Sequence, residues 1–128
     1  LQRKVKSEKL KKITIHNKFG DSMPIFKRSK VVFMGGSLVK HGGQNPLEPI
    51  SYGCFVLSGH FNINFDEIYL NLEKLNLGKT MKSDNLEKIS NEINNLLKAK
   101  FHNVNEIENF ININKNNLDK ITNMIDKC

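Results

Sequence analysis

Two short apolar runs that are each closed by glycine constrain the fold of this chain most. Val31–Met34 is followed by Gly35-Gly36, and Cys54–Leu57 is followed by Ser58-Gly59. Continuous apolar runs of this length, bounded by turn residues, are typical of strands buried on both faces of a parallel sheet. Parallel strands need a crossover between them, so the sequence predicts a helix between the two runs.

The residues between the two runs predict where that helix begins and ends. Positions 35–46 form a glycine-rich loop with two Gly-Gly pairs. Asn45 is a good N-cap, and Pro46 suits the first helical position because its missing N–H is not needed there. Glu48 in the first turn suits the helix dipole, and Gly53 suits the position just after the last turn.

The rest of the chain alternates between the same two kinds of element. Before the first run, the pattern predicts a strand at 13–15 and a turn at 17–21 that pivots on Gly20. After the second run, it predicts a helix at 65–76 stopped by Gly78 and an edge strand at 79–81. Two helices follow, one from a Ser83-Asp84 cap to Ala99 and a last one at 105–127 with a break at its asparagines. Alternating strands and helices predict an α/β fold, a Rossmann-like parallel sheet flanked by helices.

Composition bounds the class of protein. A chain of 128 residues is the size of one ordinary domain, and its formal net charge is +7. Residues 1–40 carry 11 Lys and Arg against 2 Asp and Glu, whereas residues 41–128 carry 9 against 11. Only Arg3 and Arg28 are arginines, which disfavours specific reading of nucleic acid. We expect Cys54 to be a small buried side chain. The sequence shows neither a secretory leader nor an apolar stretch long enough to span a membrane.

The block at positions 35–49, GGSLVKHGGQNPLEP, carries the chemistry. Ligands of open α/β sheets bind beyond the carboxyl ends of the strands, where Ser37 would lie. Gly42 and Gly43 allow close approach of a ligand, and the N–H groups of the following helix start favour an anion. With Glu48 to accept hydrogen bonds from a sugar diol, these features indicate a nucleotide-sugar site. Taken singly, each feature is better explained by turn chemistry, helix capping or, for His41, an ordinary loop position.

The whole block closely resembles the signature of the 3-deoxy-D-manno-octulosonic acid (Kdo) transferases. The similarity extends to the strand before the block, to Tyr52–Leu57 after it, to Asn64-Phe65 with Glu67-Ile68, and to a Gly-Asp-Ser-Met turn at 20–23. It covers about residues 11–99. Two segments depart from the family: the stretch after Met23 is shorter, and His60 is displaced by one position.

The resemblance implies a fold and an activity. The family has the two-domain GT-B fold, and residues 1–128 correspond to a single C-terminal, nucleotide-sugar-binding domain without the N-terminal acceptor domain. The family transfers Kdo from CMP-Kdo to a lipid A precursor in lipopolysaccharide synthesis, with inversion and without a metal or other cofactor. Its members act at the cytoplasmic face of the inner membrane, so the partners implied are CMP-Kdo, the lipid A precursor and, through the full enzyme, the membrane surface.

The resemblance also assigns residues. Asn45, Pro46, Leu47 and Glu48 are the implied contacts of the CMP moiety, with the helix start facing the phosphate and Glu48 taking the ribose hydroxyls. Ser37, Gly43 and Met23 are implied as weaker contacts of the same pocket. The catalytic base is expected on the N-terminal domain, so no catalytic residue is assigned and the segment alone is expected to be inactive.

Two other classes of function stay open at this point. The chain could instead be a basic module whose Lys-rich N-terminal segment contacts nucleic acid or an anionic membrane. It could also be a regulator that binds a nucleotide or sugar without activity. Thermal stabilisation by CMP that depends on Glu48 favours the transferase domain, and salt-sensitive nucleic-acid binding that ignores Glu48 favours the basic module.

Overall fold

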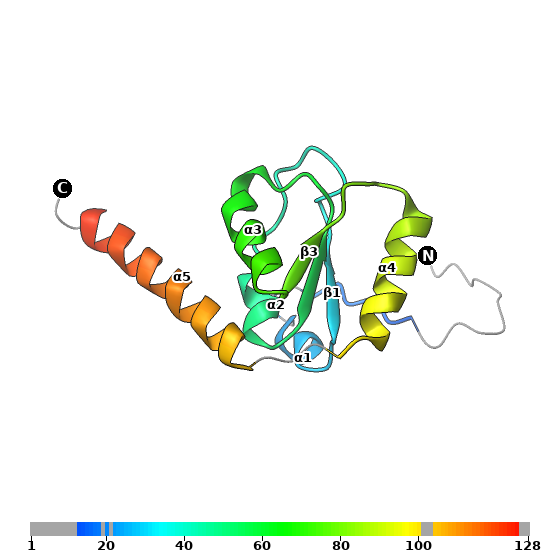
Figure 1. Cartoon of the computed structure of the whole chain (residues 1–128), viewed down its shortest axis with the longest axis horizontal. Helices are drawn as coiled ribbons and strands as arrows, with labels where there is room; N and C mark the ends of the chain where they lie inside the picture. The colour runs from blue at the N-terminus through cyan, green and yellow to red at the C-terminus, as the bar shows by residue number, and fades with distance from the viewer. Residues whose placement is uncertain (1–12, 19, 21, 101–103, 126–128) are drawn as a thin grey trace.

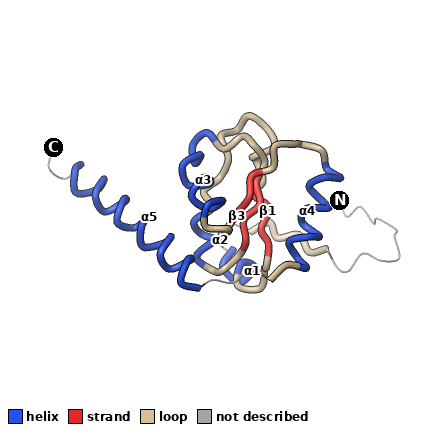
Figure 2. The backbone as a smooth tube through the Cα atoms, in the orientation of Figure 1, coloured by secondary structure: helices blue, strands red, loops and turns tan. Residues whose placement is uncertain are grey.

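The structure is a computed structural model that describes residues 13–18, 20, 22–100 and 104–125, with side chains of the last helix described over 105–115. Three parallel strands form a sheet in the order β1-β2-β3. They are β1 (Val31–Met34), β2 (Phe55–Ser58) and β3 (Gly78–Thr80). Figure 2 shows these strands at the centre with helices on both sides. The predicted α/β, Rossmann-like parallel sheet flanked by helices is confirmed.

From β1 onward the helices follow the strands in the predicted alternation, whereas the short helix before β1 was not predicted. They are α1 (Ser22–Phe26), α2 (Leu47–Ser51), the 3-10 turn η1 (Ile63–Phe65), α3 (Asp66–Lys74), α4 (Leu86–Lys98) and α5 (Val104–Ile125). In Figure 1, α3 and α4 lie on opposite sides of the sheet, and α5 leads away from the body of the domain. Helix α2 crosses from β1 to β2, and α3 crosses from β2 to β3.

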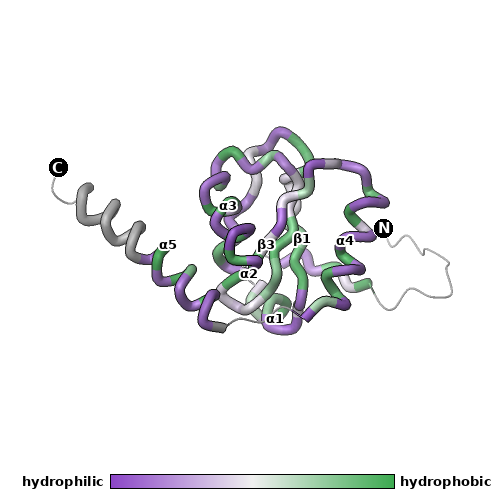
Figure 3. Tube along the Cα trace, viewed as in Figure 1, coloured by the Kyte–Doolittle hydropathy of each residue, from purple (hydrophilic) through white to green (hydrophobic). Residues whose placement is uncertain are grey.

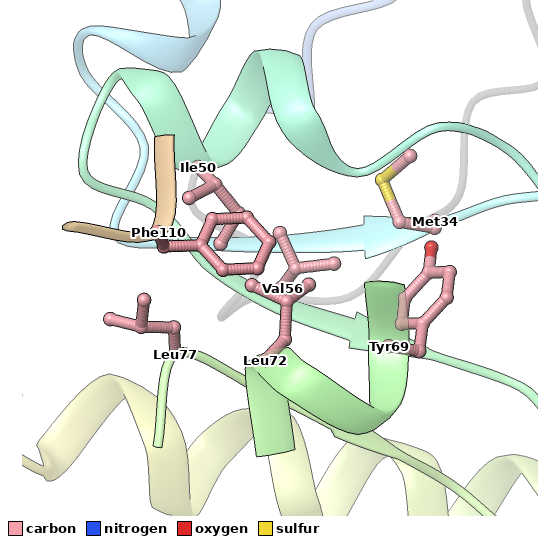
Figure 4. Close-up of a cluster of buried hydrophobic side chains, with 7 residues drawn as sticks. All are labelled: Met34, Ile50, Val56, Tyr69, Leu72, Leu77 and Phe110. Carbon is pink, nitrogen blue, oxygen red and sulfur yellow. The ribbon is translucent and has the colours of Figure 1, made fainter. Parts of the chain in front are cut away.

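One face of the sheet carries the larger apolar cluster (Figure 4). Its buried members are Met34, Ile50, Val56, Tyr69, Leu72, Leu77 and Phe110. They come from β1, α2, β2, α3, the turn before β3, and α5. Phe110 is 1% exposed, so burial of this single ring fixes the start of α5 against the domain.

The opposite face of the sheet is covered by α4. The buried residues there are Phe55, Leu57, Ile89 and Leu96. In Figure 3 the tube is green along β1, whereas α3 and α4 alternate between purple and green, as expected for helices with one apolar face. Leu86 and Leu97 also belong to the apolar pattern of α4, but they are 74% and 48% exposed. The sheet thus contacts a narrower stripe of the helix than its apolar pattern spans.

Backbone geometry confirms the predicted end of α2 and corrects the predicted end of α3. After α2, Gly53 has φ +82°, and the N–H groups of Gly53 and Cys54 donate to the carbonyls of Ile50 and Pro49, which is a Schellman ending. After α3, the residue with positive φ is Asn76, at +54°, and not Gly78. Gly78 is instead the first residue of β3.

Three further predictions about elements need correction. Ile13 and Ile15 are 71% and 86% exposed and form no strand, because no described strand pairs with them. Asn85, rather than Ser83 or Asp84, caps α4 by accepting a hydrogen bond from the Lys88 N–H at 3.0 Å.

The predicted break in the last helix is absent, since α5 is continuous over its 22 residues. The Asn114 amide donates to the carbonyl of Phe110 at 2.8 Å, one turn earlier, so this side chain follows the helix instead of competing with it. Residues 1–12, including the Lys-rich lead-in, and Cys128 lie outside the described residues. Cys54 is buried, as predicted, and burial raises the pKa of its thiol.

Candidate functional site

The glycine-rich loop that follows β1 lies at the carboxyl edge of the sheet, where α/β folds place their ligands. Gly36, Gly42 and Gly43 adopt positive φ values of +72°, +93° and +77°. Side chains other than glycine rarely adopt this conformation, so the path of the loop depends on these residues. The loop therefore has a defined shape before any ligand is present.

Ser37 ties this loop to the segment after β2. Its side chain is fully buried, and its Oγ donates to the Met34 carbonyl at 2.6 Å and accepts from the Gly59 N–H at 2.7 Å. The Ser37 carbonyl accepts from the Phe61 N–H at 3.0 Å. Both hydrogen-bonding functions of the Ser37 side chain are thus used within the fold.

Gly43 packs directly on Asn62, which is 2% exposed. A Cβ on Gly43 would lie 2.7 Å from Asn62 Oδ1, an oxygen with no hydrogen-bond partner among the described residues. The amide nitrogen of Asn62 donates to Ser58 Oγ at 2.9 Å and to the Gly59 carbonyl at 2.7 Å. Gly43 is therefore required for close packing of the two loops, independently of any ligand.

Tyr69 anchors the end of the loop from α3. Its hydroxyl donates to the Gln44 carbonyl at 3.1 Å. Burial raises the pKa of Tyr69 to about 12, against an opposing effect of a hydrogen bond with Ser58. The phenol stays protonated at neutral pH and serves as a permanent donor to the loop.

The start of α2 offers fewer backbone donors than we expected. Asn45 Oδ1 accepts from the Leu47 N–H at 3.0 Å, but the N-cap residue is Pro46 and the helix begins at Leu47, one position later than predicted. Pro46 and Pro49 have no N–H. Among the described residues, only the Glu48 N–H in this turn is left without a hydrogen-bond partner. The prediction of several N–H groups facing a phosphate was therefore wrong, because prolines and the cap remove all but one.

Glu48 and the Gly-Asp-Ser-Met turn, 26 positions apart, meet in space. Ser22 Oγ donates to Glu48 Oε1 at 2.8 Å. Met23, the next residue of α1, is 47% exposed. The contact leaves Glu48 Oε2 as a further acceptor on an exposed carboxylate. Two segments that were each predicted to contact the same ligand are thus brought together.

The predicted residues fall into two groups. Asn45, Glu48 and Met23 are exposed, and Leu47 is half-buried, so a ligand could reach them. Pro46 is buried, as is Ser37, and Gly43 is half-buried against Asn62. Sequence reasoning gave Ser22 no role of its own, because only the fold brings it to Glu48.

A cavity of about 360 Å³ lies beyond β2 and β3 instead of beyond β1. It is lined by His60, Asn62, Asp66, Tyr69, Leu70, Glu73, Thr80 and Lys82. None of the residues predicted to bind the donor lines it. The cavity is lined by both acidic and basic side chains, which do not indicate one class of ligand. We therefore place the candidate site at the exposed carboxylate of Glu48 and not in the cavity.

Over the described part of the chain, no three His, Cys, Asp or Glu side chains are grouped so that they could hold a metal ion. No helix in the same part of the chain is both long and apolar enough to cross a membrane.

Comparison with known proteins adds a similar protein of known name. No protein-family model matches the chain. A 3-deoxy-D-manno-octulosonic acid transferase of Haemophilus influenzae is 42% identical over 57 residues, which is 44% of this chain and 13% of the length of that protein. The chain contains a Kdo transferase-like region. Its parallel, Rossmann-like α/β sheet is consistent with a glycosyltransferase.

The match to the Kdo transferase spans a small part of that relative's length. The relative's name says that it transfers 3-deoxy-D-manno-octulosonic acid.

Proposed function

We propose that the chain is the donor-binding part of a glycosyltransferase that moves Kdo from CMP-Kdo to a lipid A precursor, and that residues 1–128 form its C-terminal domain. The Ser22–Glu48 hydrogen bond carries the proposal, because it brings the two similar segments together around an exposed carboxylate. The similarity to a Kdo transferase of Haemophilus influenzae supports the choice of sugar.

Glu48 would bind the ribose of CMP. With Oε1 held by Ser22, the carboxylate keeps Oε2 and further lone pairs for the two vicinal hydroxyls. Hydrogen bonds to a charged acceptor contribute about 1.5–3 kcal/mol each. Asn45, Pro46 and Leu47 precede Glu48 in the chain and Met23 follows Ser22, so these residues would border the bound nucleotide.

The phosphate of CMP would face the Glu48 N–H and the backbone of the glycine loop. Ser37 and Gly43 would not contact the nucleotide directly. They would hold the glycine loop against the segment at 58–62 and so fix its position. The buried residues of the motif would thus affect nucleotide binding by positioning the loop, while Glu48 contacts the nucleotide.

Transfer itself would need a second domain. In this proposal the base that deprotonates the acceptor hydroxyl, the lipid-binding surface and the contact with the cytoplasmic face of the inner membrane belong to an N-terminal domain. Positioning of two reactants and general-base catalysis each contribute large rate factors. The chain by itself would therefore bind the nucleotide, without a metal or other cofactor, and not complete the reaction.

The test is a titration of residues 1–128 with CMP, followed by thermal unfolding and calorimetry. Glu48→Gln should weaken binding about tenfold or more, because the ribose loses a charged acceptor. Glu87→Gln is the matched control, since Glu87 is an exposed first-turn glutamate of α4. Equal CMP affinity in the Glu48 variant and the control would sink the proposal.

Ser22 gives a second, finer test of the same site. Ser22→Ala removes the donor to Glu48 Oε1 and should weaken CMP binding about threefold to tenfold, while Ser22→Thr should restore it. Because Ser22 lies in a short surface helix, the melting temperature without CMP should change little. If the Ser22→Ala variant binds CMP with unchanged affinity, Ser22 does not take part in CMP binding.

A second candidate function has one observation in its favour. The basic surplus of residues 1–40 suits a module that contacts nucleic acid or an anionic membrane. That reading predicts nucleic-acid or vesicle binding that falls steeply with salt and is indifferent to Glu48→Gln.

A further inference from the structure

Tyr69 joins the apolar core of the domain to the glycine-rich loop. Its side chain is 3% exposed and belongs to the larger apolar cluster, and Figure 4 shows the ring at the Met34 end of that cluster. The hydroxyl donates to the Gln44 carbonyl in the loop at 3.1 Å. A phenylalanine ring would fill the same space, so packing alone does not account for the hydroxyl.

A second polar contact holds this hydroxyl from β2, the central strand of the described sheet. The hydroxyl forms a hydrogen bond with Ser58, the fully buried last residue of β2. Ser58 Oγ in turn accepts from the Asn62 amide at 2.9 Å. The Asn62 amide also donates to the Gly59 carbonyl at 2.7 Å, so turning the amide round would break that bond. The position of the Tyr69 hydroxyl is therefore set by the end of a strand.

The carbonyl that Tyr69 binds belongs to the peptide unit between Gln44 and Asn45. A trans peptide is planar, and its C=O and N–H groups point in opposite directions. The Gln44 carbonyl points toward Tyr69 on α3, so the Asn45 N–H points away from α3. Asn45 is exposed, and its N–H has no hydrogen-bond partner among the described residues. Tyr69 thus fixes the direction of a backbone donor that the fold leaves unused.

This donor lies three residues before the carboxylate of the candidate site. Asn45 Oδ1 accepts from the Leu47 N–H at 3.0 Å, which fixes the backbone between the donor and Glu48. Ser22 on α1 holds Glu48 Oε1 at 2.8 Å. One helix therefore positions an acceptor that suits hydroxyl groups, and another helix positions a donor that suits an anion.

We infer that Tyr69 is a positioning residue of the donor site, which turns the Asn45 N–H toward the phosphate of the nucleotide through the Gln44 carbonyl. The inference rests on the proposed function for the identity of the ligand. Tyr69 is buried, so it acts through the loop and does not contact the nucleotide. A donor that is fixed before the ligand arrives need not be ordered on binding, which favours affinity. Loss of the hydroxyl therefore affects the phosphate, whereas Glu48 binds the ribose.

Binding of CMP and of cytidine separates this role from a general effect on the fold. Cytidine has the base and the ribose of CMP but no phosphate. Tyr69→Phe keeps the buried ring and removes the hydroxyl. We expect it to weaken CMP binding about threefold to tenfold and cytidine binding by less than about twofold, because only CMP can accept from the Asn45 N–H. NMR titrations of residues 1–128, at a temperature where each variant is folded, measure both affinities.

Tyr52→Phe is the matched control. Tyr52 lies at the other end of α2, where its ring stacks on Phe26 with 6.2 Å between the ring centroids. Its hydroxyl has no hydrogen-bond partner in the described part of the chain, so this variant should bind both ligands as the natural chain does. The Asn45 amide signal gives a direct readout. CMP should shift this signal in the natural chain, cytidine should not, and the shift should be smaller in Tyr69→Phe.

The outcomes separate this inference from the proposed function. Equal weakening of CMP and cytidine binding in Tyr69→Phe, or weakening of neither, overturns the inference and leaves the proposed function in place. An Asn45 amide signal that CMP does not shift in the natural chain has the same meaning. Absence of any CMP binding by the natural chain contradicts the proposed function, and the inference with it.

Discussion

At the scale of single residues, Gly59 and Ser37 show how close the two loops approach. A Cβ on Gly59 would overlap the Ser37 carbonyl oxygen and crowd the Leu38 side chain. The Gly59 N–H is at the same time the donor to Ser37 Oγ. The contact is backbone against backbone, so neither partner can move aside without distorting a strand end.

Gly59→Ala should therefore destabilise the fold by about 1–3 kcal/mol, the usual cost of overpacking a tight site. Gly35→Ala is the control, because a Cβ there meets nothing within 4 Å and its φ is not positive. Urea unfolding of both variants measures the difference. A Gly59→Ala variant as stable as Gly35→Ala would show that the loops are not packed as described.

Tyr69 makes a prediction about alkaline pH. Its folded pKa of about 12 lies above the ordinary value of 10.0, so its contribution to stability is complete below pH 10 and is lost as the pH rises through 12. The variant Tyr69→Phe should lose less stability between pH 10 and 12 than the natural chain. Chemical unfolding at a series of pH values measures this, and parallel curves for the two proteins would contradict the shifted pKa.

Single-residue chemistry was only partly predictable from the sequence. Asn45 was predicted to accept a hydrogen bond at the start of α2 and does so, because its partner Leu47 is two positions away, although the helix starts one residue later than predicted. The Ser22–Glu48 and Ser37–Gly59 contacts join residues 26 and 22 positions apart, so they depend on how the strands pair. No local pattern indicates such contacts.

At the scale of elements, helix ends depend on tertiary contacts as much as on propensity. Lys30, just before β1, donates from its Nζ to the carbonyls of Leu97 and Ala99 at 2.6 and 2.5 Å. These carbonyls lie at the C-terminal end of α4, where a cation is favoured by the helix dipole. Helix α4 is thereby attached to the sheet by a polar contact as well as by its apolar face.

Lys30→Met should lower the free energy of unfolding by about 1 kcal/mol, because the last carbonyls of α4 lose a charged donor. Lys88→Met, at an exposed position within α4, should change it by less than about 0.5 kcal/mol. Urea unfolding followed by circular dichroism measures both. Equal effects of the two substitutions would show that Lys30 does not cap α4.

Elements with a strong local signal were predicted well, and others were not. The strands β1 and β2 were predicted within a residue of their bounds, since apolar runs closed by glycine have few alternatives. The shorter run at 13–15 is not closed by glycine and lacks a described neighbour, and it is not a strand. Asn76 replaced Gly78 as the end of α3 because asparagine also tolerates the left-handed conformation.

At the scale of the whole molecule, the parallel order of the sheet followed from the alternation of strands and helices. What the sequence could not indicate is the number of strands that β1 pairs with. An interior strand and an edge strand can have the same apolar sequence, so the sequence does not show that β1 pairs with only one strand among the described residues.

The chain is expected to lack transferase activity on its own. Residues 1–128 incubated with CMP-Kdo and a lipid A precursor should give no Kdo-lipid product, because the proposed base and acceptor site lie on another domain. Product analysis by mass spectrometry measures this, with a full-length Kdo transferase as the positive control. Any Kdo transfer by the isolated chain would contradict the division of roles.

The anchored loop at 35–46 has a consequence for proteolysis. Lys40 is exposed near the tip of this loop, whereas Ser37 before it and Gln44 after it are bonded to Phe61 and Tyr69. Trypsin could cut after Lys40 without separating the two pieces, because β1 on one piece stays paired with β2 on the other. A nicked but folded domain of this kind would allow one half to be isotopically labelled and reassembled with the other half unlabelled.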